Sequence, residues 1–343
     1  MITQNFWLNR YIMITAVCTV FLMGIILAGC TDKSTENEFK VAMLLPGEVT
    51  DAGWNQLAYE GLLAIEKELG AKVNHVVSRT PTDQAEHFRF YASKGYDLIF
   101  GHGFEFQEPA KEVAPDFLET IFINSSGGFT GENIAPINFR VEQPAYLMGI
   151  IAGMMTKSNK LGVLGGDRIP SIQSTFLAFE EGAKSINPDV VVLDSYTGNW
   201  DDVGAGKRNS KALIDQGVDF LFPNADAAGR GAYEAAEEAK KDGKTVYTFG
   251  VNKDKSYISP DTVLANGVIT PDAFVQIARI VKDGKFEKQI YTYNMLKDEA
   301  ITFNYNPKMK DKITDEVLKK VEEVKAKILA AEFEVPQIDF ANE

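Results

Sequence analysis

From residue 39 onward, short apolar runs alternate with longer amphipathic segments along almost the whole chain. In the first repeat, the largely apolar Lys40–Leu45 ends at Pro46, and Asn55–Leu69 carries apolar residues at helical spacing. Apolar runs without polar alternation are typical of strands buried on both faces, and the amphipathic segments between them supply the covering helices. The alternation therefore predicts an α/β fold built from parallel sheets.

The same alternation occurs twice, and a predicted helix at 141–157, with small residues in its middle, lies between the two runs. A chain of 343 residues has room for two domains, because domains usually hold about 100–200 residues. Strands are expected at 40–45, 73–77, 96–100 and 120–123 in the first unit, and at 161–164, 190–195, 219–222, 245–249 and 262–265 in the second. Two extended stretches, 290–293 and 300–303, precede a charged helix at 314–331. The sequence thus predicts two similar α/β units.

The first thirty residues resemble an export signal. Arg10 precedes an apolar run from Tyr11 to Leu27, and the sequence Leu-Ala-Gly-Cys ends at Cys30. A positive start, an apolar centre and small residues at the end are typical of a secretory signal peptide. Leu-Ala-Gly-Cys is similar to the bacterial lipobox, which implies that 1–29 is a signal peptide and that Cys30 is lipidated. The polar segment 30–38 would then be a tether, and the alternative is an uncleaved membrane anchor.

The composition excludes several classes of function. The net charge is −13, from 35 Lys and Arg against 48 Asp and Glu, and the basic residues form no cluster, so no nucleic-acid partner is expected. The two cysteines are Cys18 and Cys30, so residues 31–343 hold no thiol for a disulfide, a zinc site or a nucleophile. With only three histidines in the chain, neither a metal nor a cofactor is expected.

Candidate binding residues follow the predicted strands, because ligands of open parallel sheets bind beyond the carboxyl ends of the strands. Trp54 and Trp200 both occupy such positions, one in each unit. Flat rings beside amides and carboxylates suit a planar polar heterocycle, and Asp226 is placed to accept a hydrogen bond from a ring N–H or an exocyclic amine. The candidate ligand-binding residues are Trp54, Asn55, Gly103, Phe104, Asn124, Trp200, Asn224, Asp226 and Asn252. The alternative is that these positions serve turns and packing alone.

Motifs of catalysis are absent from the sequence. The segment 204–208 suggests a phosphate-binding loop, but its first glycine is misplaced and Arg208 stands where such loops need Ser or Thr. His102 is interpreted as a turn or cleft residue, since no serine or cysteine nucleophile motif accompanies it. No spacing singles out a pair among the carboxylates Glu48, Asp51, Glu105, Asp226 and Asp254. We therefore expect a binding protein and not an enzyme.

The strand-end loops and the segment 145–157 resemble the basic membrane protein family of lipoproteins. Further matching segments are 187–189, 212–219 and 283–286. Members of this family, including purine-nucleoside-binding ones, are substrate-binding components of ABC importers. The resemblance implies a type I periplasmic-binding-protein fold, in which two doubly wound parallel-sheet lobes are joined by a hinge and bind ligand between them. Lobe 1 is expected at 39–140 plus about 266–290, and lobe 2 at 141–250 plus about 291–335.

The resemblance also implies roles for single residues. Asn55 matches a polar contact after the first strand, Phe104 an aromatic residue that stacks on the base from the first lobe, and Trp200 an aromatic residue of the second. Two segments depart from the nucleoside-binding pattern. Residues 250–254 are Gly-Val-Asn-Lys-Asp instead of Gly-Val-Asp-Ser-Asp, and the following strand, 264–268, lacks a lysine. Because these groups are associated with the sugar, a free purine base or another planar heterocycle is an alternative to a nucleoside.

The expected function is therefore that of a lipid-anchored substrate-binding protein of an ABC importer, on the extracytoplasmic side of the cell membrane. It would capture a small purine-like heterocycle by hinged closure. Its expected partners are the ligand and the ABC permease, and it is expected to be a monomer. The alternatives are a sensory or surface lipoprotein of the same fold, and an exported nucleoside hydrolase.

Overall fold

The computed structural model describes residues 38–296 and 300–338. The predicted signal peptide at 1–29, the lipidation site Cys30 and all of the tether except Glu38 lie outside the described residues. Within the described part of the chain, no helix combines the length and the apolar character that crossing a membrane requires.

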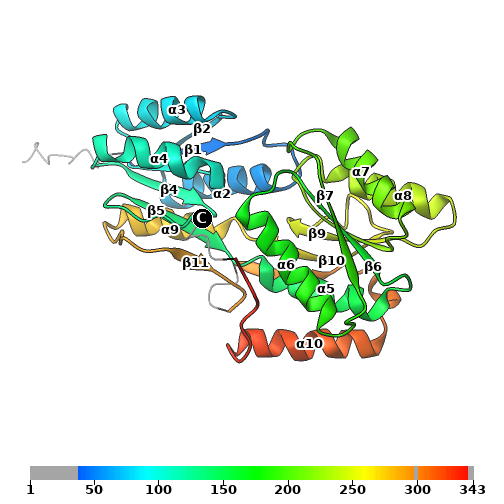
Figure 1. Ribbon diagram of the computed structural model, residues 1–343. Helices are drawn as coiled ribbons and strands as arrows, with labels where there is room; N and C mark the ends of the chain where they lie inside the picture. The colour runs from blue at the N-terminus through cyan, green and yellow to red at the C-terminus, as the bar shows by residue number, and fades with distance from the viewer. Residues whose placement is uncertain (1–37, 297–299, 339–343) are drawn as a thin grey trace, which may run out of the picture. The chain divides into compact units, whose positions relative to one another are not determined.

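The first sheet contains six parallel strands with two helices on each face (Figure 1). Its strands, in spatial order, are β11 (Tyr291–Tyr293), β5 (Ile134–Phe139), β4 (Ile121–Ser125), β3 (Leu98–Gly101), β1 (Lys40–Leu45) and β2 (Lys72–Val77). One face packs against α2 (Trp54–Leu69) and α9 (Asp272–Lys282), and the other against α3 (Pro81–Ser93) and α4 (Gln107–Val113). Short 3-10 turns at Phe104–Phe106 and Ala114–Asp116 flank α4.

The second sheet also has six strands, and one edge strand runs antiparallel to the rest. Its order is β12 (Ile301–Tyr305), β10 (Val263–Ile269), β9 (Tyr247–Asn252), β8 (Phe220–Asn224), β6 (Lys160–Gly165) and β7 (Val191–Tyr196). The helices are α7 (Val203–Asp215) and α8 (Arg230–Lys241) on one face, and α5 (Glu142–Met155), α6 (Pro170–Lys184) and α10 (Asp315–Leu329) on the other (Figure 1). A 3-10 turn, Lys310–Lys312, precedes α10.

The chain passes between the sheets after β5, after β10 and after β11. We call the first sheet with its helices the first lobe, and the second sheet with its helices the second lobe. The fold class predicted from the sequence, two doubly wound α/β lobes, is confirmed. The strands cross the expected lobe boundaries by a few residues. Strand β10, in the second sheet, extends to Ile269, past the expected boundary at about 266, and β11, in the first sheet, begins at Tyr291, past the expected boundary at about 290.

One strand, β5, was not expected from the sequence. It contains Pro136, and proline in a central strand removes a donor of the hydrogen-bond ladder. The neighbouring β11 pairs with β5 only from Ile137 onward, so no residue of β11 lies opposite Pro136 and none needs its missing N–H group. Strand β5 therefore tolerates a proline at position 136 although it has neighbouring strands on both sides.

The helices α5 and α6 pack through glycines at very short backbone separation. A Cβ atom added to Gly149 would lie 2.0 Å from the carbonyl oxygen of Phe179, and one added to Gly182 would lie 2.1 Å from that of Tyr146. No side-chain carbon fits at these distances. Glycine is therefore required by the packing, although it weakens helices.

Replacing Gly149 by alanine should lower the free energy of unfolding by about 1–3 kcal/mol, because the methyl group forces the two backbones apart. Helix propensity alone would favour alanine by about 1 kcal/mol. The matched control is Gly204→Ala in α7, where the added carbon would meet only the side-chain ends of Asp202 and Arg208. Urea denaturation followed by circular dichroism measures both, and equal stabilities would contradict the close packing.

Candidate functional site

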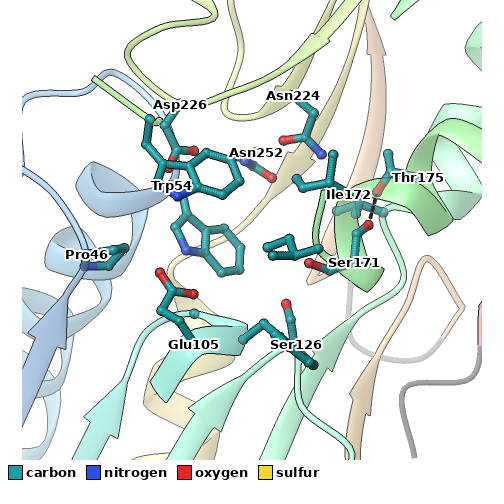
Figure 2. Close-up of a pocket in the computed structure, with 15 residues that line it drawn as sticks. Pro46, Trp54, Glu105, Ser126, Ser171, Ile172, Thr175, Asn224, Asp226 and Asn252 are labelled. Atoms are coloured by element: carbon teal, nitrogen blue, oxygen red, sulfur yellow. Dashed lines mark hydrogen bonds between the residues drawn. The ribbon is translucent and has the colours of Figure 1, made fainter. Parts of the chain in front are cut away.

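A cavity lies at the carboxyl ends of the strands, with walls from both lobes (Figure 2). Parallel pairing collects these strand ends at one edge of each sheet, where ligands of such sheets bind. The lining residues are Pro46, Trp54, Gly103, Phe104, Glu105 and Ser126 of the first lobe, Val141 at a crossing between the sheets, and Ile169, Ser171, Ile172, Thr175, Trp200, Asn224, Asp226 and Asn252 of the second.

The structure brings seven of the nine predicted ligand-binding residues to this cavity. They are Trp54, Gly103, Phe104, Trp200, Asn224, Asp226 and Asn252. The other two, Asn55 and Asn124, are buried and do not line it. The two tryptophans of the strand ends therefore face one shared space.

Asn55 belongs to the support of the loop after β1. Its Oδ1 accepts from the backbone N–H of Gly47 at 3.2 Å, and its Nδ2 donates to Asp51 Oδ2 at 3.0 Å. The Asp51 carboxylate also accepts the backbone N–H groups of Gly53, Asn55 and Gln56, at 2.8–3.0 Å. These bonds satisfy free N–H groups at the start of α2 and place Trp54.

Asn124 lies on the opposite face of β4 from the histidine contact of its neighbour Ser125. Its side chain is fully buried, and neither its oxygen nor its nitrogen has a hydrogen-bond partner. Glycine is required next to it, since a Cβ on Gly127 would lie 2.1 Å from Asn124 Nδ2. The strand-end rule selected this residue by position alone, without regard to the face on which its side chain lies.

The indole of Trp54 rests on the ring of His102, with centroids 3.9 Å apart and planes inclined by 20°. Two hydrogen bonds join the same pair: Trp54 Nε1 donates to the carbonyl oxygen of His102 at 3.3 Å, and His102 Nε2 lies 3.0 Å from the carbonyl oxygen of Trp54. A carbonyl oxygen only accepts, so Nε2 carries the proton and Nδ1 accepts from Ser125 Oγ at 2.9 Å. His102 is fully buried and outside the cavity, where it orients the tryptophan.

Burial lowers the pKa of His102 to about 3, and the hydrogen bond to the Trp54 carbonyl opposes this shift only in part. The imidazole is therefore neutral at physiological pH. Neutrality preserves the acceptor at Nδ1 and hence the contact with Ser125.

Trp200 is placed by the loop after β6. A Cβ on Gly166 would lie 2.2 Å from Cε3 of the indole, so the ring lies directly on the Gly166 backbone. The carbonyl oxygen of Trp200 accepts from the N–H of Ala228 at 2.9 Å. Asn199 Oδ1 accepts from the N–H groups of Asp201 and Asp202, which forms the turn after the tryptophan.

Three lining residues other than glycine have a positive φ. The angles are 62° at Ser126, 46° at Asp226 and 67° at Asn252. Such backbone costs free energy and is concentrated at functional sites. Each residue lies at or just beyond the end of β4, β8 or β9, so the strained turns direct these side chains to the cavity.

The cavity carries two carboxylates with altered acidity. Burial raises the pKa of Glu105 to about 7, with a further contribution from the charge of Asp167. Burial also raises the pKa of Asp226 well above its usual range, and Asp51 and Glu105 add to this by repulsion. Lys255 lies in the adjoining cavity, where burial lowers its pKa to about 8 although Asp51 and Asp226 partly offset the effect.

Contacts between the lobes lie beside the cavity. The ammonium of Lys255 donates to the carbonyl oxygen of Ala52, and Lys253 forms an ion pair with Glu60 on α2. The remaining space is about 60 Å³, against about 300–1,000 Å³ for typical small-molecule sites. A purine-sized solute therefore does not fit between the lobes as they lie in this structure and would need them to lie further apart.

Sequence reasoning did not select several lining residues. Glu105 and Ser126 belong to the strand-end loops and were not chosen, because nothing in the sequence distinguished them from turn residues. Ser171, Ile172 and Thr175 line the cavity from the first turns of α6. The sequence could have predicted these three residues, because α6 begins soon after β6 ends and the first turns of such helices adjoin the carboxyl ends of the strands.

Solved structures share this architecture. An ABC transporter solute-binding protein from Aeropyrum pernix K1 superposes with a TM-score of 0.79 at 24% identity, over 88% of this chain and 94% of that one. A transcriptional activator of the comK gene from Bacillus halodurans superposes with a TM-score of 0.70 at 23% identity, over 86% and 99%. The chain therefore has the type I solute-binding fold that the family resemblance implied.

Residues 39–339 match the family described as Bmp, ABC transporter substrate-binding protein PnrA-like. The chain belongs to this family of ABC transporter substrate-binding proteins, which confirms the resemblance seen in the sequence. Basic membrane protein A of Borreliella burgdorferi is 28% identical, over 92% of this chain and 94% of that protein. The ABC transporter nucleoside-binding protein BmpA of Lactococcus lactis is 27% identical, over 94% and 98%.

Because its pKa in the folded protein lies below the ordinary value of about 6.5, His102 stabilises the fold above that pH and loses this contribution as the pH falls toward 3. His102→Gln removes the titration. The stability advantage of the wild type over the variant should shrink by about 1.4 kcal/mol per pH unit, or somewhat less, between pH 6 and 4. Urea denaturation at each pH measures the difference, and parallel stability curves would refute a buried neutral histidine.

Proposed function

We propose that this chain is the lipid-anchored, extracytoplasmic substrate-binding protein of an ABC importer, and that it captures a planar purine-like heterocycle between its lobes. The observation that carries the proposal is that Trp54 of the first lobe and Trp200 of the second line one cavity. The family supplies the transport class, and a relative named as nucleoside-binding supports the ligand class. Lipidation at Cys30 rests on the Leu-Ala-Gly-Cys sequence, and we propose a monomer that delivers its ligand to the permease.

The chemistry of the walls fits a flat, polar solute. Indole faces stack on aromatic rings, while the amides of Asn224 and Asn252 both donate and accept at the ring edge. Asp226 adds an acceptor for N–H groups. Each lobe offers only part of these contacts, so the ligand binds the closed form better and shifts the population toward it.

Recognition of a ribose has less support than recognition of the base. Lys253 is paired with Glu60, and the ammonium of Lys255 is bound to the carbonyl oxygen of Ala52, so neither cation faces the cavity. Asn252 is the residue of this loop that lines it. We therefore include free bases beside nucleosides among the ligands to test.

Binding without chemical change is the favoured form of this function. The fully buried His102 lies outside the cavity, with both ring nitrogens engaged. The lining hydroxyl groups therefore have no imidazole beside them to act as a general base; they belong to Ser126, Ser171 and Thr175.

The proposal is tested by a thermal-shift screen of the full-length chain in detergent against nucleobases, nucleosides, vitamins and sugars. A ligand present at about 100 times its dissociation constant should add about 2.7 kcal/mol of stability. Purine bases or nucleosides should produce the shift, and recovery of the unaltered ligand by chromatography should exclude hydrolysis. Stabilisation by sugars alone would contradict the proposal.

Replacing Trp54 or Trp200 by alanine should weaken binding of the ligand from the screen by about tenfold, because an aromatic pair contributes about 0.5–1.5 kcal/mol beyond its buried area. Isothermal titration calorimetry measures the affinity. The matched control is Phe90→Ala, since Phe90 is 51% exposed on α3 and away from the cavity. Unchanged affinity in both tryptophan variants would remove these residues from the site.

Glu60→Gln should weaken the same affinity by about two- to fivefold, since partly exposed ion pairs contribute up to about 1 kcal/mol and this pair joins the lobes without lining the cavity. The control is Glu66→Gln on the same helix, because Glu66 forms no ion pair among the described residues. If both variants bind as the wild type does, the Lys253–Glu60 pair does not stabilise closure.

A further inference from the structure

Among the described residues that line the cavity, only two side chains titrate, and both are acids. Glu105 comes from the turn after β3 in the first lobe, and Asp226 from the turn after β8 in the second. Both side chains are among the lining residues drawn in Figure 2. A solute between the tryptophans therefore meets a carboxyl group from each lobe.

Protein groups leave these carboxylates largely unpaired. Across the described chain, no donor hydrogen-bonds the carboxylate of Asp226, and Glu105 accepts from its own backbone N–H. The charged groups that act on Asp226 are the acids Asp51, Glu105 and Asp201 and the base Lys255. Since Asp51 is already bonded to the N-terminus of α2, its charge is not available to balance another cation.

The ammonium that acts on Asp226 belongs to Lys255, which is not among the residues lining the cavity. Lys255 lines the adjoining space behind Asp226, and its Nζ donates to the carbonyl oxygen of Ala52. The charge acting on Glu105 besides Asp226 is that of Asp167, another acid. The buried cluster thus holds more carboxylates than cations, and burying unpaired charge costs free energy.

We propose that the solute bound in this cleft is a cationic planar heterocycle, such as an N-alkylated purine, whose positive ring lies between Trp54 and Trp200 and faces Glu105 and Asp226. This inference rests on the proposed function and narrows its ligand class. Indole faces attract cations through the ring quadrupole, so the walls and the carboxylates favour the same charge. Phosphorylated or carboxylated solutes are repelled by both acids.

Two isomers separate charge from shape. 1,9-Dimethyladenine is protonated and therefore cationic at pH 7.5, while its isomer N6,9-dimethyladenine, with two methyl groups on the same ring system, is neutral. Calorimetry on the full-length chain in detergent should give an affinity for the cation at least tenfold higher than for the neutral isomer. Equal affinities, or tighter binding of the neutral isomer, would overturn the inference and leave the proposed function standing. If neither isomer binds and the screen also finds no purine, both fail.

Variants that remove one charge each test whether Glu105 and Asp226 cause the preference for the cation. Glu105→Gln and Asp226→Asn should each reduce the preference for the cation, measured as the ratio of the two affinities, at least threefold. The matched control is Glu132→Gln, an exposed change in the first lobe that should leave the preference unchanged. A preference that survives in both cavity variants would assign it to the tryptophans alone and contradict the role of the carboxylates.

The pH dependence gives an independent measurement. Glu105 ionises near pH 7, next to Asp167 and Asp226, so affinity for the cation should rise between pH 6 and 8. Affinity for the neutral isomer should change less over this range. Glu105→Gln should remove this rise, and a rise that persists in the variant would assign the titration to another group.

Discussion

Parallel strand pairing is the constraint on which the rest of this structure depends. Because neighbouring strands run in one direction, the turns at their carboxyl ends collect at one edge of each sheet. The crossings after β5, β10 and β11 then bring the two edges to opposite walls of one cavity. Residues separated by almost 150 positions, such as Trp54 and Trp200, come to share a space through this arrangement alone.

The walls of the cavity depend in turn on groups that never reach it. Asp51 and Asn55 fix the start of α2, and the neutral His102 supports the indole of Trp54 from behind. Glycine at position 166 lets Trp200 lie on the backbone of the second lobe. The polar groups of these supporting residues have hydrogen-bond partners within the protein, whereas the carboxylate of Asp226 has none among the described residues. This contrast separates the scaffold of the cavity from the proposed binding group.

The sequence predicts the fold well because buried parallel strands have a distinctive pattern, and the strand-end rule then selects loops by position. That rule cannot tell on which face a side chain lies, so it included Asn124, whose amide is buried under the loop that contains Gly127. It also cannot weigh burial, and therefore Glu105 was indistinguishable from an ordinary turn residue. Strand β5 escaped prediction because Pro136 argues against a central strand unless the partial pairing with β11 is known.

If the cleft closes on its ligand as proposed, its unpaired acids have a consequence for transport. In the closed form, Glu105 and Asp226 repel each other and lose hydration, so they oppose closure when the cleft is empty. Polar contacts that favour closure include Lys253 with Glu60, Lys255 with Ala52 and Arg79 with Asp201. A cationic ligand removes the repulsion and thereby makes its largest contribution in the closed form, which is the differential affinity that a population shift requires. In this scheme the same two carboxylates determine which solute binds and ensure that closure depends on it.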